Sequence, residues 1–216
     1  MVQLTLQGMF PVEPPFLGNG PMTVIYDDGS VLVSFRGNFC CQPQVWPYEI
    51  GHVDPADVED LLATAGNVGL LAEPSPYAPT NVVDAARTML VLDTTGGVYT
   101  HVADGLQSGD EPDPRRAALQ GFIGEVVALT EFVEVGEAFY SPTRVAVVAA
   151  PVDTTPGAVV EWPDASVSLA DAVACTPVTD PAAVEAVNSA LAGTGFRQDG
   201  ITYQLAARII PPGIDC

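Results

Sequence analysis

The dipeptide Asp-Pro precedes an apolar stretch three times, and this feature most restricts how the chain folds. The three copies are Asp54-Pro55, Asp113-Pro114 and Asp180-Pro181. An aspartate caps the first N–H groups of a helix, and proline suits the first helical position, where no N–H donor is needed. Apolar residues follow each copy at spacings of three and four, which gives each helix one apolar face. The pattern predicts three amphipathic helices, of which only the second is long.

Two segments rich in β-branched and aromatic residues surround a glycine-bearing turn, which is typical of β-hairpins. The first spans residues 23–35 around the turn Asp27–Ser30, and the second spans residues 88–102 around a loop at 93–97. Glycine supplies the positive φ that such tight connections require. Each hairpin precedes one of the first two predicted helices. The same hairpin-plus-helix unit is therefore predicted twice, and a shared sheet is one natural outcome.

The C-terminal third predicts strands at 144–150, 159–162 and 201–210 beside the short third helix. The fold class that follows is α+β: two β-hairpin-plus-helix units and a C-terminal αβ portion, with helices packed on a mostly antiparallel sheet. A proline-rich segment suggests a boundary near residue 150. We expect a tandem hairpin-helix region at 1–150 and a C-terminal subdomain at 151–216 packed on it, or else one single domain.

The charge of the chain is strongly negative. There are 27 acidic residues against 7 basic ones, every basic residue is arginine, and the net charge is -20. Such a field repels phosphate backbones and anionic head groups, so a nucleic-acid role is not expected. The longest clean apolar run, Val145 to Ala150, falls far short of the roughly 18 residues of a membrane helix. We therefore expect no transmembrane span in this chain.

Four cysteines occur, Cys40, Cys41, Cys175 and Cys216, at spacings unlike those of zinc sites. The thiol of Cys216 is best explained by pairing in an oxidising compartment, which favours export. Because adjacent residues on an extended chain point to opposite faces, we expect Cys175 to pair with Cys216. Cys40 and Cys41 form either a strained vicinal bridge or two thiols. Residues 1–6 lack the pattern of a secretory signal, so if the protein is exported, its signal or anchor is expected to lie upstream of residue 1, outside this sequence.

No catalytic, cofactor-binding or metal-binding residue is assigned from the sequence. There is no nucleophile elbow, and the two histidines, His52 and His101, are predicted to have structural roles. The oxygen-rich segment 104–113 lacks the ligand spacing of an EF-hand loop and is interpreted as a solvated loop ahead of a helix. Two carboxylates out of 27 will always be neighbours somewhere, so a carboxylate pair predicts nothing without geometry.

The aromatic residues Phe39, Trp46 and Tyr48 lie beside the cysteine pair in a segment of weak secondary-structure signal. Aromatic side chains on such a loop suit recognition of a protein or a glycan. The same residues also fit a loop folded back onto the core with Trp46 as its plug, and the sequence favours this interpretation. Trp162, next to Pro163 after an apolar strand, is predicted to lie in the core.

Several short motifs resemble a domain of unknown function found in exported proteins and lipoproteins of high-GC Gram-positive bacteria. They are Tyr26-x-Asp28-Gly29-x-Val31, Tyr77, Asp84, Trp162-Pro163, Cys175, Arg208-x-x-Pro211-Pro212 and Cys216. The resemblance implies an envelope location and a lipid anchor upstream, and it implies no activity. The Cys40-Cys41 pair departs from that pattern.

The leading functional hypothesis is a non-enzymatic, extracytoplasmic envelope module. It would bind another protein or serve as an accessory subunit of a membrane-associated assembly. One alternative is a carboxylate- or metal-dependent hydrolase of envelope glycans. The other is a glycan or small-ligand binder that uses Trp46 and Tyr48.

Overall fold

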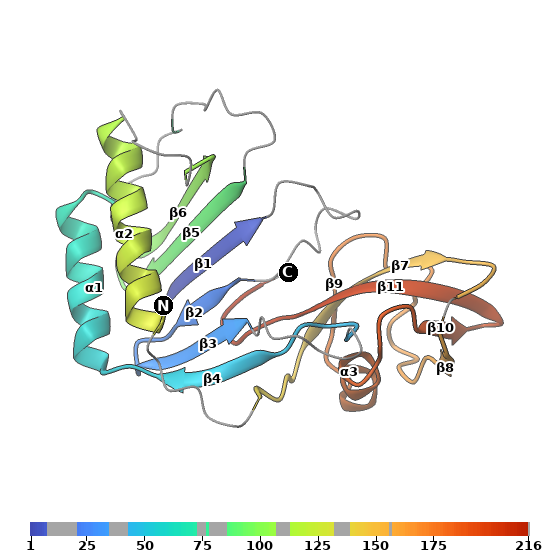
Figure 1. The fold of residues 1–216 in the computed structure, drawn as a ribbon. Helices are drawn as coiled ribbons and strands as arrows, with labels where there is room; N and C mark the ends of the chain where they lie inside the picture. The colour runs from blue at the N-terminus through green and yellow to red at the C-terminus, as the bar shows by residue number, and fades with distance from the viewer. Residues whose placement is uncertain are drawn as a thin grey trace. The chain divides into compact units, whose positions relative to one another are not determined.

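The computed structural model describes residues 1–7, 21–34, 43–72, 77, 86–106, 113–131, 139–155 and 157–215, with residues 5–7 described by their backbone alone. Within these ranges there are three helices and eleven strands, arranged in two mostly antiparallel sheets (Figure 1). The predicted α+β class is confirmed. The chain divides into two compact units, and each unit contains one of the sheets.

The first unit contains a six-stranded sheet in which every neighbouring pair is antiparallel. Its strand order is β4-β3-β2-β1-β5-β6. The strands are β1 (Val2–Gln7), β2 (Thr23–Ile25), β3 (Ser30–Ser34), β4 (Tyr48–His52), β5 (Arg87–Thr94) and β6 (Gly97–Asp104). Both predicted hairpins are confirmed as β2–β3 and β5–β6, and β1 lies between them (Figure 1). The two hairpins therefore share one sheet.

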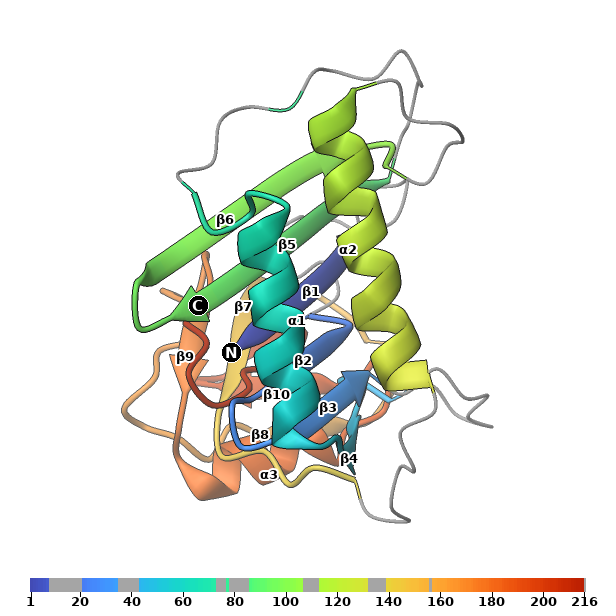
Figure 2. The same cartoon turned by 90° about the vertical axis from the view of Figure 1, so that its left-hand side faces the viewer.

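Two helices, α1 (Pro55–Asn67) and α2 (Pro114–Glu131), cover one face of this sheet (Figure 2). Both predicted caps are present. Asp54 Oδ1 accepts from the Ala56 N–H at 3.0 Å, and Asp113 Oδ1 accepts from the Arg115 N–H at 2.9 Å. The apolar stripes of both helices are buried against the sheet, and each large aliphatic side chain buried there contributes about 1.5–3 kcal/mol. The buried helix residues are Val58, Leu61, Ala65, Leu119, Phe122, Ile123 and Val126.

The second unit contains a five-stranded sheet in the order β8-β10-β11-β7-β9. Its strands are β7 (Val145–Pro151), β8 (Val159–Glu161), β9 (Thr176–Val178), β10 (Gly195–Gln198) and β11 (Ile201–Ile209). The pair β8–β10 is parallel, and the other pairs are antiparallel. Helix α3 (Pro181–Asn188) begins at its predicted cap, where Asp180 Oδ1 accepts from the Ala183 N–H at 3.0 Å.

The core of the second unit includes Trp162, as predicted. Its indole is 8% exposed and stands edge-on to Phe196 with ring centroids 5.8 Å apart. Its Nε1–H donates to the Val167 carbonyl at 3.1 Å. The polar end of the indole is therefore satisfied inside the unit.

Strand β7 is the strand predicted at 144–150, and it pairs with β11 and β9 rather than with either hairpin. The second unit accordingly takes in the chain from Tyr140 onward, before the predicted boundary at residue 150, and it also includes residues 43–47. The division into two domains, or into a single one, stays a prediction. None of the helices in the described ranges is long and apolar enough to cross a membrane.

Candidate functional site

The segment 43–47 of the second unit is a short loop held to that unit by its backbone. Pro43 forms an isolated antiparallel bridge with Leu191. The Gln44 N–H donates to the Ala190 carbonyl at 2.8 Å, and the Gln44 side-chain amide donates to the Leu205 carbonyl. The loop is thus fixed at two places, just beyond α3 and on β11.

This loop presents a tryptophan at the surface. Val45 is its buried residue, with 2% of its surface exposed, whereas Trp46 is 41% exposed. Leu191, the bridge partner of the loop, is 52% exposed. A large aromatic surface on a backbone that is already fixed suits binding, because little conformational entropy remains to be lost. Among the described aromatic residues of the predicted recognition loop, Trp46 is the exposed one.

The other two aromatic residues of the predicted recognition loop are placed differently. Tyr48 opens β4 in the first unit, is 3% exposed, and donates its hydroxyl proton to the Pro21 carbonyl at 2.8 Å. Its ring is buried and is therefore not placed at the surface. Phe39 lies outside the described residues, as do Cys40 and Cys41.

Cys175 is a described cysteine, and it lies just before β9. Its sulfur lies 3.9 Å from Nη2 of Arg208 on β11. The other three cysteines, Cys216 among them, lie outside the described residues. The pairing of Cys175 with Cys216 therefore stays a prediction.

A buried polar cluster in the first unit centres on His101 of β6, which is 3% exposed. His101 Nε2 lies 2.8 Å from the Leu70 carbonyl oxygen, and Nδ1 lies 2.8 Å from the Tyr77 hydroxyl. Because a carbonyl oxygen only accepts, Nε2 carries a proton, and in the neutral imidazole Nδ1 then accepts from Tyr77. The predicted structural role of His101 is confirmed. His52, the second histidine, ends β4 and is exposed.

The surroundings of this cluster keep both groups uncharged. Burial lowers the pKa of His101, the hydrogen bond to Leu70 opposes that shift, and the charge of Arg115 adds to it. Burial also raises the pKa of Tyr77, although the Arg115 guanidinium lies 5.0 Å from the centroid of its ring. A tyrosine with a raised pKa is not an activated nucleophile. The Tyr77–His101 pair therefore fits packing better than catalysis.

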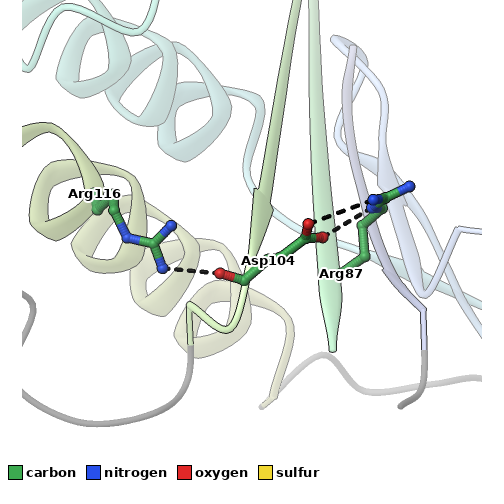
Figure 3. Close-up of polar contacts among 3 residues, drawn as sticks. All are labelled: Arg87, Asp104 and Arg116. Carbon is green, nitrogen blue, oxygen red and sulfur yellow. Dashed lines mark hydrogen bonds and ion pairs between the residues drawn. The ribbon is translucent and has the colours of Figure 1, made fainter. Parts of the chain in front are cut away.

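A second polar group joins the ends of β5 and β6 to α2 (Figure 3). Arg87 Nε donates to Asp104 Oδ1 at 2.8 Å, and this hydrogen bond is the main reason that the pKa of Asp104 is lowered. Arg116, which is 4% exposed, donates from Nη2 to the Asp104 backbone carbonyl at 2.9 Å. Asp104 opens the segment considered as a calcium loop from the sequence, and its carboxylate is engaged by Arg87. Residues 107–112 of that segment lie outside the described residues.

A shallow groove of about 280 Å³ is lined by residues of α1 and α2 and is rich in carboxylates. Its lining is Asp57, Asp60, Leu61, Thr64, Glu125 and Leu129. Within the described residues, no three His, Cys, Asp or Glu side chains are grouped closely enough to hold a metal ion. The spacing of Asp57 and Asp60 is readable from the sequence, but the approach of Glu125 depends on how the two helices pack. The ionisable groups that line the groove are all carboxylates, from Asp57, Asp60 and Glu125.

In comparisons with models of known protein families and with curated proteins, the chain matches none. The resemblance to exported and lipoprotein domains stays a prediction. What can be said of function therefore depends on the geometry of this chain.

Proposed function

We propose that this chain is a non-enzymatic, exported protein-binding module that serves as an accessory subunit of an assembly at the cell envelope. The observation that carries the proposal is the exposed Trp46 on the backbone-anchored loop 43–47. Tryptophan is enriched among the residues that dominate the energy of protein interfaces.

Export is supported by the even count of four cysteines at spacings unlike those of zinc sites, because disulfide bonds persist in oxidising compartments outside the cytosol. The resemblance to envelope lipoproteins points the same way, and a lipid anchor upstream would hold the module at the membrane. The net charge of -20 favours a partner with a basic surface, since opposite charges speed the encounter of two proteins.

Co-purification under mild detergent tests the proposal, with the wild type and Trp46→Ala compared side by side. The wild type should retain a partner, and Trp46→Ala should weaken the complex at least tenfold, which corresponds to about 1.4 kcal/mol. Val173→Ala is the matched control, because Val173 is 70% exposed and belongs to the same unit. A chain recovered alone in every condition, yet turning over a substrate, overturns the proposal.

Mass spectrometry without a reducing agent tests the export part of the proposal. A peptide pair that joins Cys175 to Cys216 is the expected product. Four titratable thiols in freshly isolated material contradict both the pairing and the envelope location.

The carboxylate groove favours a second candidate, a hydrolase of envelope glycans, because it is a concave surface lined by three acids. This candidate predicts glycan cleavage that Asp60→Asn abolishes. Glu59→Gln is its control, since Glu59 is an exposed acid on α1 outside the groove lining. Intact activity in Asp60→Asn removes the candidate.

A glycan or small-ligand binder is the third candidate and also depends on Trp46. Soluble glycans are added to the protein, and the change in tryptophan fluorescence is measured. Trp46→Phe should remove this change. Trp162 is buried and supplies a constant background.

A further inference from the structure

The two edges of the first sheet differ in how they are protected. At one edge, β4 carries Glu49, and this residue forms an isolated antiparallel bridge with Phe139. At the other edge lies β6, and within the described ranges no strand or isolated bridge pairs with its outer side (Figure 1). An eight-residue strand whose outer backbone groups find no strand partner among the described residues is a template for another strand.

Strand β6 also lacks the features that usually protect an edge. Between Gly97 and Ala103 it contains no charged residue and no proline. Val98, Thr100 and Val102 are exposed on one face, with Val98 at 63% and Val102 at 43%. Edge strands normally carry charges, prolines or bulges that discourage association. This strand carries two exposed valines instead.

The β5–β6 hairpin is nearly neutral in a strongly acidic chain. Among residues 86–106 there is one basic residue, Arg87, and there are two acidic ones, Asp93 and Asp104, which gives a net charge of -1 against -20 for the whole chain. Two copies of an acidic protein repel each other least where their surfaces carry the least charge. A second copy therefore meets the smallest local repulsion at this hairpin.

The sequence of β6 is self-complementary about Thr100. In an antiparallel pair of identical strands centred there, Val98 of one copy lies opposite Val102 of the other, and Tyr99 lies opposite His101. Thr100 lies opposite its own copy. Apolar residues then face apolar residues and threonine faces threonine, which are favourable cross-strand pairs. A two-fold interface needs this kind of self-complementarity, whereas binding of an unrelated strand does not.

We propose that two copies of this chain associate through antiparallel pairing of their β6 strands, with Thr100 opposite Thr100. The six-stranded sheets of the two copies then continue into one sheet of twelve strands. This interface belongs to the first unit and is independent of the Trp46 loop in the second.

Site-directed crosslinking tests the register. The Cα atoms of directly opposed residues in an antiparallel pair lie about 4.5–5.5 Å apart, which a disulfide can span. Under mild oxidation, Thr100→Cys should give a reducible dimer in at least half of the protein. Val98→Cys should crosslink no more than the wild type, and Val98→Cys combined with Val102→Cys should restore the dimer. Equal crosslinking of Thr100→Cys and Val98→Cys overturns the proposed register.

Sedimentation equilibrium tests the association itself in the unmodified chain. We expect a monomer–dimer equilibrium that tightens as salt is added, because salt screens the repulsion between two chains of net charge -20. Thr100→Lys places two lysines opposite each other and should weaken the dimer at least tenfold. Val173→Lys adds the same charge on the second unit and should leave it unchanged, while circular dichroism verifies the fold of both variants. A wild type that stays monomeric, or a dimer that Thr100→Lys does not weaken, overturns the proposal.

Discussion

The Tyr77 hydroxyl lies 2.8 Å from Nδ1 of His101, and it donates to this nitrogen when His101 is in the neutral form that burial favours. The other ring nitrogen donates to the Leu70 carbonyl at the same distance. Protonation of Nδ1 would remove the acceptor that Tyr77 uses and would place a positive charge in a buried site close to Arg115. The fold of the first unit is thus coupled to the charge of one imidazole.

Acidification should destabilise the chain through His101. The pKa of His101 in the folded state is lowered from 6.5, chiefly by burial, so the folded chain binds fewer protons than the unfolded one. The stability that depends on neutral His101 is complete above pH 6.5 and is lost as the pH falls through the folded-state pKa. Urea unfolding followed from pH 8 to pH 5 measures this. His101→Gln should flatten the profile, and His52→Gln, at an exposed position, should leave it as in the wild type.

Removal of the Tyr77 hydroxyl should cost about 1 kcal/mol of unfolding free energy. Tyr77→Phe keeps the ring beside Arg115 but leaves Nδ1 of His101 without its donor, and an unsatisfied buried acceptor is destabilising by this amount. Tyr99→Phe is the matched control, because the described contact of the Tyr99 hydroxyl is a long one, 3.5 Å to the Gly96 carbonyl. Equal losses in the two variants would show that the Tyr77–His101 contact contributes little.

The two arginines that contact Asp104 should differ in their effect on stability. The Arg87–Asp104 ion pair is exposed, with 55% and 47% of the two side chains accessible, so Arg87→Gln should cost less than about 1 kcal/mol and still less in high salt. Arg116 is buried and bonds the Asp104 carbonyl, so Arg116→Gln should cost about 2 kcal/mol. Denaturant unfolding at low and high salt measures both. A larger loss for Arg87→Gln contradicts this ranking.

Local signals were enough to predict the helices and the hairpins. Asp54, Asp113 and Asp180 each use a side-chain oxygen to cap the helix that follows, so the information for a helix start lies within a few residues. The turn at Gly29 likewise connects neighbouring strands. In these places sequence neighbours are also spatial neighbours, and pattern reasoning succeeds.

Two strands of the first sheet, β1 and β4, were not predicted. β1 pairs with β5 over Val2–Gln7, and β4 contains Glu49 and Gly51, which weaken a strand signal. The candidate site shows the same limit. The sequence favours Trp46 as a core plug, yet the bridge between Pro43 and Leu191 fixes a loop in which Val45 is buried and Trp46 is exposed. Long-range pairing decides which of two adjacent apolar residues faces the solvent.

The turn of the first hairpin should tolerate no side chain at Gly29. Its φ is +83°, a left-handed conformation that costs other residues roughly 1–2 kcal/mol, and a Cβ there would collide with the Val53 carbonyl oxygen. Gly69 has a similar φ of +80° with nothing within 4 Å of an added Cβ, so Gly69→Ala isolates the conformational cost. Gly29→Ala should therefore lose clearly more unfolding free energy than Gly69→Ala. Urea denaturation of the two variants measures the difference, and equal losses would mean that the Val53 carbonyl moves aside without cost.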